Sequence, residues 1–513
     1  MDTRRTLARH LVLFVVTAAT LAFHAGARAQ SSPEPETPPS ETPSGEEGTE
    51  AAPADAPVSE GARAAELEQD QVDPDTTPDA STPAADAEIP IVPATAPPPP
   101  APASPTPATG DVRVHFEAGQ GLQITSNDGR FELIVRARAQ FLLSVRHPDA
   151  QDAGIDFELR RARIYFQGAL FDPNIRFTLQ LGVSPSCSDM GNNFAGNSCV
   201  GPQPNAPTTL SGFTPRWSPL LDWYVELRHL RELNVRVGQM IPTFSRTFTI
   251  GDANYQFIDR SLGDGEFNLD RTFAIELRSS DFLGLGWLRY YAGVMSTQGR
   301  DMPFAPDLHL GYYARVDVNP LGFFNDYTQG DLARNVDPRL SIGVGYAFLD
   351  HAPFDRGTIG LLPVDGGTTD QHLFTADFVF MWHGFSLLGE WSLRQAQRHQ
   401  GTALDPMTMM PYATPTAPRT GYGLHATAGI LLGDLPLEIV ARVGMLRRMS
   451  SWDSSMSGVV SAINDQNEAG AGINWYIEGH PLKLSLWFTD VWRDDGTGSS
   501  GTQTVRLQFQ ATL

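Results

Sequence analysis

The sequence has 513 residues with a mean hydropathy of −0.22, and its 37 basic and 59 acidic side chains give a formal net charge of −22. Beyond the N-terminus, no run reaches the roughly 18 consecutive apolar residues that a transmembrane helix requires, which excludes a helical membrane protein. The chain contains no basic domain, and this argues against a nucleic-acid partner.

The N-terminal segment has the three parts of a secretory signal peptide. MDTRRTLARH is basic, LVLFVVTAATLAF is apolar, and Ala27–Ala29 supply the small residues of a cleavage site. A signal anchor is the alternative, but the apolar run is short for a bilayer. We therefore expect residues 1–29 to be removed on export.

Residues 30–110 form an acidic, Pro/Ala-rich linker. They hold 19 of the 40 prolines, and residues 31–110 carry 16 acidic side chains against one arginine. Such a composition cannot bury enough apolar surface to offset the entropy of ordering, so we expect this leader to be disordered. Most of the negative charge of the chain therefore belongs to the leader.

From residue 111 to residue 513 the sequence alternates apolar and polar residues with a period of two. In NIRFTLQLGV and TVRLQFQATL one face is apolar and the other polar, as in a β-strand. Sixteen such segments occur, near residues 131–145, 156–170, 174–184, 220–229, 233–241, 271–279, 287–295, 308–318, 339–349, 371–382, 385–395, 420–432, 437–448, 468–478, 482–493 and 501–513. Their length, and the tryptophans near their ends, favour an all-β fold, a sixteen-stranded antiparallel transmembrane β-barrel, over a soluble β-sandwich.

The connections between these segments mostly alternate in length. FDPN, LRE, HG, GDLP and GHP are tight turns, and long loops occur at residues 185–219, 242–270, 350–370, 396–419 and 449–467. Outer-membrane barrels have short turns at one end and long loops at the other. The connection at residues 319–338 is too long for its place, which suggests a wrong strand assignment there.

The two cysteines, Cys187 and Cys199, lie in the first long loop. In an exported chain, an even pair at this spacing favours a disulfide, and two unpaired thiols are the alternative. No histidine or further cysteine lies nearby, so we do not expect a metal site there.

The segment FELRRARIYFQG, residues 157–168, changes the phase of its alternation. Before the shift the apolar face holds the odd-numbered residues Phe157 and Leu159. After it the apolar face holds the even-numbered residues Ala162, Ile164 and Phe166. A β-bulge at Arg160–Arg161 would produce this shift and direct both guanidinium groups into the lumen. A charged side chain near the lipid midplane costs about 2–4 kcal/mol, so we expect the lumen for Arg163 as well.

Three stretches resemble the phosphate-selective porin O and P family of Gram-negative outer membranes. They are DGRFELIVRARAQF with FELRRARIYFQGALFD, LNVRVGQMIPTFS with FIDRSL, and INWYIEGHPLKLSLWFTD with TVRLQFQATL. The resemblance covers most of residues 120–513. It implies a homotrimer of sixteen-stranded barrels in outer-membrane lipid, with the third long loop folded inward as a constriction and with arginines that draw phosphate-like anions through.

The resemblance places the arginine pair of the family at Arg160 and Arg161, and its third-loop elements at Phe244–Ser245 and Arg260–Leu262. The sequence also departs from the pattern of the family. Isoleucine stands at position 241, where many relatives have lysine, and the whole chain contains a single lysine. These departures argue against strict phosphate selectivity.

We predict that five arginines line the pore and contact anions: Arg160, Arg161, Arg163, Arg246 and Arg260. Guanidinium groups bind phosphate through paired hydrogen bonds. Residues 231–271, however, hold six acidic side chains against five arginines, so the alternative is that arginine–acid pairs hold the third loop to the wall. A Ca²⁺ ion bound by the loop acids is conceivable, but oxygen-rich loops are usually solvated, and we expect neither a metal nor a cofactor.

These features favour passive diffusion of small anions, such as phosphate or polyphosphate, through an outer-membrane channel. The alternative is a general non-selective porin whose acidic leader has a structural or cell-wall-tethering role. A barrel enzyme would need a nucleophile and a histidine at one rim. The barrel histidines show no such spacing, and we expect no enzymatic activity: His309, His351, His372, His383, His399 and His425.

Overall fold

The computed structural model of the protein describes residues 112–149, 152–184, 219–300, 309–360, 362–405, 408–410, 417–452, 461, 463–494 and 499–513. The predicted signal peptide, the predicted linker and the predicted disulfide between Cys187 and Cys199 lie outside these residues and stay predictions. No helix in the described part of the chain is long and apolar enough to cross a membrane.

Eighteen strands form one sheet, and two short helices and two 3-10 turns accompany them in the described residues. The strands are β1 (Val112–Glu117), β2 (Gly121–Ser126), β3 (Glu132–Pro148), β4 (Gly154–Leu170), β5 (Asp172–Gly182), β6 (Leu220–Leu230), β7 (Leu233–Met240), β8 (Thr272–Ser279), β9 (Leu288–Ser296), β10 (Leu310–Val318), β11 (Arg339–Ala352), β12 (Thr368–Trp382), β13 (Phe385–His399), β14 (Gly421–Leu431), β15 (Leu437–Arg448), β16 (Gln466–Glu478), β17 (Leu482–Asp494) and β18 (Ser499–Thr512). The helical segments are α2 (Arg246–Thr249), η3 (Asp252–Asn254), α3 (Leu262–Phe267) and η4 (Phe282–Gly284).

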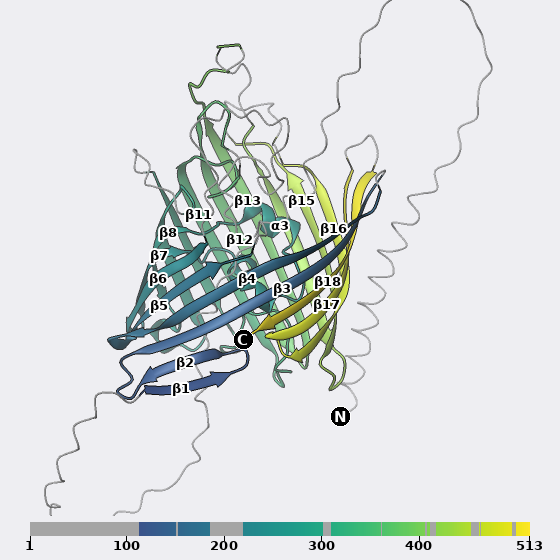
Figure 1. Ribbon diagram of the computed structural model, residues 1–513. Helices are drawn as coiled ribbons and strands as arrows, with labels where there is room; N and C mark the ends of the chain where they lie inside the picture. The colour runs from purple at the N-terminus through teal and green to yellow at the C-terminus, as the bar shows by residue number, and fades with distance from the viewer. Residues whose placement is uncertain are drawn as a thin grey trace, which may run out of the picture. The chain divides into compact units, whose positions relative to one another are not determined.

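The sheet closes on itself because its last strand pairs with β3. The β18–β3 ladder runs from Thr502 opposite Pro148 to Thr512 opposite Arg138. From β3 onward each strand pairs with its neighbours in the chain, so the sixteen strands β3 to β18 complete an antiparallel barrel (Figure 1). The predicted fold is confirmed, and each of the sixteen predicted segments overlaps one of these strands.

The hairpin of β1 and β2 was missed in the sequence. Each of its strands has six residues, too few for the alternation in VRVHFE to stand out. β2 pairs with β3 from Leu122 opposite Val135 to Thr125 opposite Glu132, beyond the point where β18 ends. The hairpin therefore extends the sheet next to the end of the C-terminal strand (Figure 1).

The wall of the barrel is apolar outside and polar inside. Along β10, Tyr312 and Val316 are 48% and 45% exposed, whereas Arg315 and Asp317 are 1% and 0% exposed. Large exposed apolar side chains recur on the other strands, for example Val225, Ile275, Val344, Trp391, Ile439, Ile473, Leu486 and Val505. Single exposed apolar side chains are common on soluble proteins, but their recurrence at the outward positions of so many strands is what contact with lipid requires.

The β-bulge expected at Arg160–Arg161 is present. Gln140 of β3 lies opposite Arg161, and the next residue of β3 lies opposite Leu159, so Arg160 is the extra residue of β4. The bulge lets two consecutive side chains face the interior, since Arg160 is 3% and Arg161 is 0% exposed, while Phe157 before it is 70% exposed.

The long connection at residues 319–338 is genuine and does not reflect a wrong strand assignment. It joins β10 to β11 at the end of the barrel that otherwise has the short turns, and it folds into the interior. Asp326 is 1% exposed, and Phe324 and Tyr327 pack against a buried cluster that includes Ile250 and Tyr255.

The connection between β7 and β8, residues 241–271, also folds into the barrel, and we call it the inward loop. All its residues are buried except Ala253 and Asn254, which are half-buried. Ser245 begins α2 by accepting a hydrogen bond from the backbone N–H of Phe248, and a capping box of Ser261 and Asp264 begins α3. These caps satisfy backbone N–H groups that a buried helix end would otherwise leave without partners.

Two glycines of the wall let the inward loop approach closely. A Cβ atom on Gly423 of β14 would lie 2.8 Å from the Cα atom of Gly263 in α3. A Cβ atom on Gly345 of β11 would lie 2.5 Å from the carbonyl oxygen of Phe244. Any larger residue at either position would push the loop away from the wall.

Candidate functional site

The candidate functional site is the interior of the barrel, where the five arginines predicted from the sequence lie. Their exposed fractions are between 0% and 3%: Arg160, Arg161, Arg163, Arg246 and Arg260. The first three belong to β4 and the last two to the inward loop. They do not form one cluster, because the β4 pair and Arg246 contact different parts of the barrel.

Arg160 and Arg161 fasten the inward loop to β4. Arg160 donates a hydrogen bond to Asp259 of the loop at 3.0 Å. The Nε atom of Arg161 lies 2.6 Å from one oxygen of Asp252, and Arg138 of β3 lies 2.6 Å from the other oxygen. Two arginines from adjacent strands therefore hold one carboxylate of the loop.

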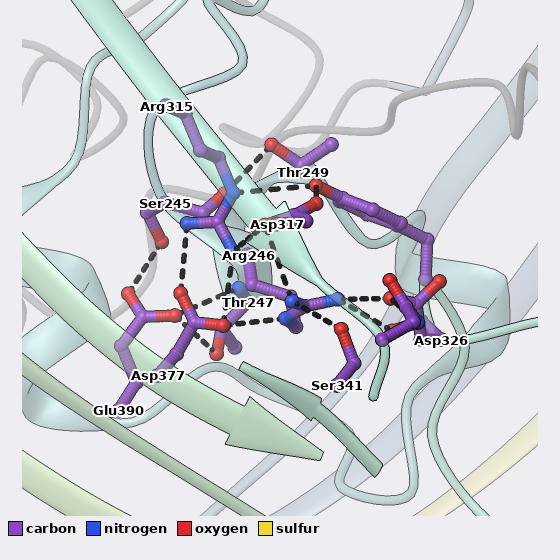
Figure 2. Close-up of polar contacts among 12 residues, drawn as sticks. Ser245, Arg246, Thr247, Thr249, Arg315, Asp317, Asp326, Ser341, Asp377 and Glu390 are labelled. Atoms are coloured by element: carbon purple, nitrogen blue, oxygen red, sulfur yellow. Dashed lines mark hydrogen bonds and ion pairs between the residues drawn. The ribbon is translucent and has the colours of Figure 1, made fainter. Parts of the chain in front are cut away.

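Arg246 fastens the first part of the inward loop, and Figure 2 shows its polar contacts. Its guanidinium group lies 2.5 Å from Asp377, 2.7 Å from Asp326 and 3.3 Å from Asp317. Arg315 of β10 lies 2.8 Å from Asp317 and 2.7 Å from Asp377. Arg289 of β9 also pairs with Asp326, so three arginines and three carboxylates form one buried network between the loop, the wall and the 319–338 connection.

The start of α2 is held by a carboxylate of the wall. Glu390 of β13 accepts hydrogen bonds from the Ser245 hydroxyl at 2.5 Å and from the backbone N–H and hydroxyl of Thr247, both at 2.9 Å (Figure 2). A helix N-terminus attracts negative charge, so this contact fixes where α2 begins.

Helix α3 is held by the reverse arrangement, with the acid on the loop. Glu266 accepts hydrogen bonds from Arg394 of β13 and from Arg419, the latter at 2.8 Å. Burial alone would raise the pKa of Glu266, but Arg419 and Arg394 outweigh it and hold the pKa at about 2. Glu266 therefore stays ionised at every physiological pH.

Arg260 contacts other residues of the inward loop, and Arg163 lies on β4. Arg260 donates to the carbonyl oxygen of Phe248 at 3.0 Å and lies over the rings of Phe248 and Tyr255, 4.0 Å and 5.1 Å from their centroids. It therefore braces the loop internally. Arg163 faces the interior opposite Arg138 of β3.

The two inward-folded connections meet inside the barrel. The backbone N–H of Gln329 donates to the carbonyl oxygen of Asn254 at 3.0 Å, and the side chain of Gln329 accepts from the backbone N–H of Gln256 at 2.8 Å. The loop that enters from the long-loop end is thus bonded to the connection that enters from the short-turn end. The sequence analysis missed this contact because it treated residues 319–338 as misassigned.

A cavity of 1210 Å³ lies at the short-turn end of the interior, between the hairpin, the inner faces of β3 to β6, β8 and β9, the inward loop and the 319–338 connection. Its charged lining comprises Arg136, Arg176, Arg228, Arg278, Arg289, Glu117, Glu132, Glu226, Asp281 and Asp326. Sequence analysis missed these arginines, although those on strands stand at inward positions of the alternation.

In two ion pairs of this cavity the arginine is the more exposed partner. The side chain of Arg176 is 31% exposed against 18% for Glu132, and that of Arg228 is 30% exposed against 3% for Glu226. A solute in the cavity therefore meets more guanidinium than carboxylate surface at these pairs. Guanidinium groups present several hydrogen-bond donors and no acceptor.

No family model and no curated protein matches the chain. Among solved structures, it is similar to the outer-membrane channel DcaP of Acinetobacter baumannii, with 11% identity and a TM-score of 0.45 over 76% of this chain and 99% of that one. It is also similar to an anion-selective porin from Comamonas acidovorans, with 12% identity and a TM-score of 0.44 over 75% of this chain and 100% of that one. These likenesses are too distant to carry over a solute, a partner or the role of a residue.

Proposed function

We propose that this chain is an outer-membrane channel through which small anions diffuse passively. The apolar outer face and polar inner face of the closed barrel support a channel, because a bilayer admits a sheet only when no strand edge is left unpaired. In this proposal outer-membrane lipid covers the apolar band. A homotrimer and a tethering role for the acidic leader stay predictions.

The proposed anion preference rests on one observation, the exposure of guanidinium groups in the cavity. Arg176 and Arg228 are each about a third exposed, while the carboxylates that they pair with, Glu132 and Glu226, are 18% and 3% exposed. The cavity lining holds five arginines and five acidic side chains, so the preference depends on which charges face the solute. In a narrow, low-dielectric passage such a local difference is amplified, because field lines are focused along the lumen. The cavity therefore favours anions where it is open to solutes.

We infer a different first role for Arg160, Arg161 and Arg246. Each is paired with carboxylates, so much of its charge is already balanced, and it acts as an anchor of the inward loop. Direct contact of these arginines with anions, and the phosphate selectivity implied by the family resemblance, stay predictions. Phosphate and polyphosphate would suit a pathway with several guanidinium groups, which bind such oxygens in pairs.

Replacing Arg176 and Arg228 by glutamine together is expected to lower the anion preference. Each lost charge should reduce the anion-to-cation permeability ratio on the order of twofold, because the field in the cavity weakens. The measurement is the reversal potential of the purified channel in a planar bilayer under a KCl gradient. Added phosphate should reduce the chloride current of the wild type more than that of the variant.

Arg231→Gln is the matched control for this experiment. Arg231 also pairs with a glutamate at the short-turn end, but it is 62% exposed and does not line the cavity. Its removal should leave the reversal potential unchanged. A wild type without anion preference would instead favour the general, non-selective porin.

A further inference from the structure

Three histidines that are far apart in the sequence meet at the long-loop rim of the barrel. His309 directly precedes β10, His351 lies at the end of β11, and His399 is the last residue of β13. The rings of His309 and His351 stack at 4.3 Å between centroids, and those of His351 and His399 stack at 4.1 Å. Together with Asp350 and Asp370 they form what we call the rim cluster.

Each imidazole of the rim cluster has a ring nitrogen beside a carboxylate. The Nδ1 atoms of His309 and His351 lie 2.8 Å and 2.6 Å from the two oxygens of Asp350. The Nε2 atom of His399 lies 2.8 Å from Asp370, and the Nδ1 atom of His351 lies 3.4 Å from it. Within each of two overlapping sets, both of which contain His351, all ligand atoms lie within 4.8 Å of one another.

A local irregularity of β11 brings His351 into this position. The pairing of β11 with β12 shifts between Leu349 and Ala352, and His351 has a φ of +48°, which only a minority of non-glycine residues adopt. Its backbone N–H donates to Asp370 at 2.8 Å, which holds the distorted segment against β12. Backbone conformations of this kind persist where the surrounding structure requires them.

The rim cluster lies on the outward face of the wall, apart from the inward loop. Asp370 stands between Thr369 and Gln371, which are 2% and 0% exposed and face the interior. The five side chains are between 19% and 36% exposed, so an ion could reach them from solution without entering the lumen. This location makes the cluster independent of the proposed channel.

We propose that the rim cluster binds one divalent transition-metal ion of the zinc class. Imidazole nitrogen and carboxylate oxygen are the ligands that Zn²⁺ prefers, at about 2.0–2.2 Å, and sets of three protein ligands are common for it. Mg²⁺ and Ca²⁺ prefer oxygen ligands only and do not suit this set. His351 belongs to both sets through the same Nδ1 atom, whose single lone pair serves one metal at a time, so we expect one ion per chain.

Metal binding replaces the hydrogen bonds that the histidines make when no ion is present. A neutral imidazole beside a carboxylate presents its N–H group to it, so the nitrogens that would ligate the ion carry protons first. The ion displaces those protons, or shifts them to the other ring nitrogen, and Asp350 and Asp370 become ligands or neighbours of the bound metal. An ion at this place joins the ends of β10 to β13, so it should also stabilise the rim.

Calorimetric titration of the full chain in detergent with ZnCl₂ tests this proposal. We expect one Zn²⁺ per chain, retained in excess MgCl₂, and loss of that binding in His351→Ala because both ligand sets lose their common member. His309→Ala and His399→Ala each leave one set, so we expect the affinity to fall at least about tenfold rather than vanish. Each variant is checked for folding by electrophoresis: a folded barrel runs at a different position in the unheated sample than in the heated sample.

His229→Ala is the matched control, since His229 also lies beside a carboxylate, 3.4 Å from Asp172, but belongs to no group of three ligands among the described residues. It should bind Zn²⁺ as the wild type does. Cys187→Ser/Cys199→Ser should behave likewise. The proposal is overturned if His351→Ala binds Zn²⁺ as tightly as the wild type, if the cysteine variant alone loses binding, or if Mg²⁺ displaces the ion.

Discussion

Replacing Arg246 by glutamine is expected to lower the free energy of unfolding by about 3–5 kcal/mol, because it removes the counter-charge of buried carboxylates. Asp317, Asp326 and Asp377 all lie within 3.3 Å of this guanidinium group, and all are at most 1% exposed as side chains. In the variant Arg315 still balances Asp317 and Asp377, and Arg289 still pairs with Asp326, but the network loses the cation that lies within 3.3 Å of all three carboxylates. The inward loop would lose the contacts of Arg246 with β10, β11 and β12, and would keep the hydrogen bond from Arg315 to the carbonyl oxygen of Phe244.

The pH dependence of this effect follows from Asp326, which lies outside the strands. Burial alone would raise the pKa of its carboxyl group, but Arg289 and Arg246 hold that pKa below its ordinary value. A carboxyl group whose pKa is lowered by folding stabilises the folded chain at pH values above its ordinary pKa of about 4. This stabilisation is lost as the pH falls below that value. The difference between wild type and variant should therefore stay constant from neutral pH down to about 4 and shrink at lower pH.

Urea unfolding of the detergent-solubilised barrel, followed by tryptophan fluorescence, measures this difference. Arg231→Gln is again the control, because its pair with Glu232 is exposed and should contribute less than about 1 kcal/mol. Equal unfolding free energies for wild type and Arg246→Gln would show that the network does not hold the loop.

Asp252→Asn is also expected to lower the free energy of unfolding by about 3–5 kcal/mol. The reason is that Arg138 and Arg161 would both lose the carboxylate with which they pair. Arg138 and Arg161 come from adjacent strands, and their side chains are 5% and 0% exposed. Asparagine keeps the size of the side chain but not its charge, so the change tests the ion pairs alone. The same urea unfolding experiment measures it.

A double-mutant cycle with Arg161→Met separates anchoring from a role in ion passage. If Arg161 acts mainly through Asp252, its replacement should cost less in the Asp252→Asn background than in the wild type, by about 0.5–3 kcal/mol. Glu132→Gln is the matched control, since Glu132 pairs with Arg176, which is about a third exposed, and this pair should contribute little to stability. Additive effects at Arg161 and Asp252 would refute the anchor and leave Arg161 free for solutes.

The strands were predictable because their cause is local. A residue on β10 or β18 faces lipid or the interior according to its position in a period of two, and no distant contact is needed to see this. The bulge at Arg160–Arg161 was predictable for the same reason, since it appears in the sequence as a shift of phase. The hairpin of β1 and β2 was missed because six residues show too few periods.

The partners of the arginines were not predictable because they depend on where the inward loop crosses the lumen. Arg246 is adjacent in sequence to none of Asp317, Asp326 and Asp377, and Asp326 belongs to a connection whose inward path the sequence does not reveal. The histidines of the rim cluster were interpreted as scattered for a similar reason. His309, His351 and His399 come together only through the order and register of β10 to β13.

The central claim is tested most directly by single-channel conductance. It is measured for the full chain and for a variant in which a short Gly/Ser linker replaces residues 245–268. The claim is that the barrel is a channel whose passage is set by an inward loop fixed to the wall. It predicts discrete steps for the wild type and larger steps for the variant, provided that heating on electrophoresis shows both to be folded. Equal steps in the two proteins, or a wild type that does not conduct, would contradict it.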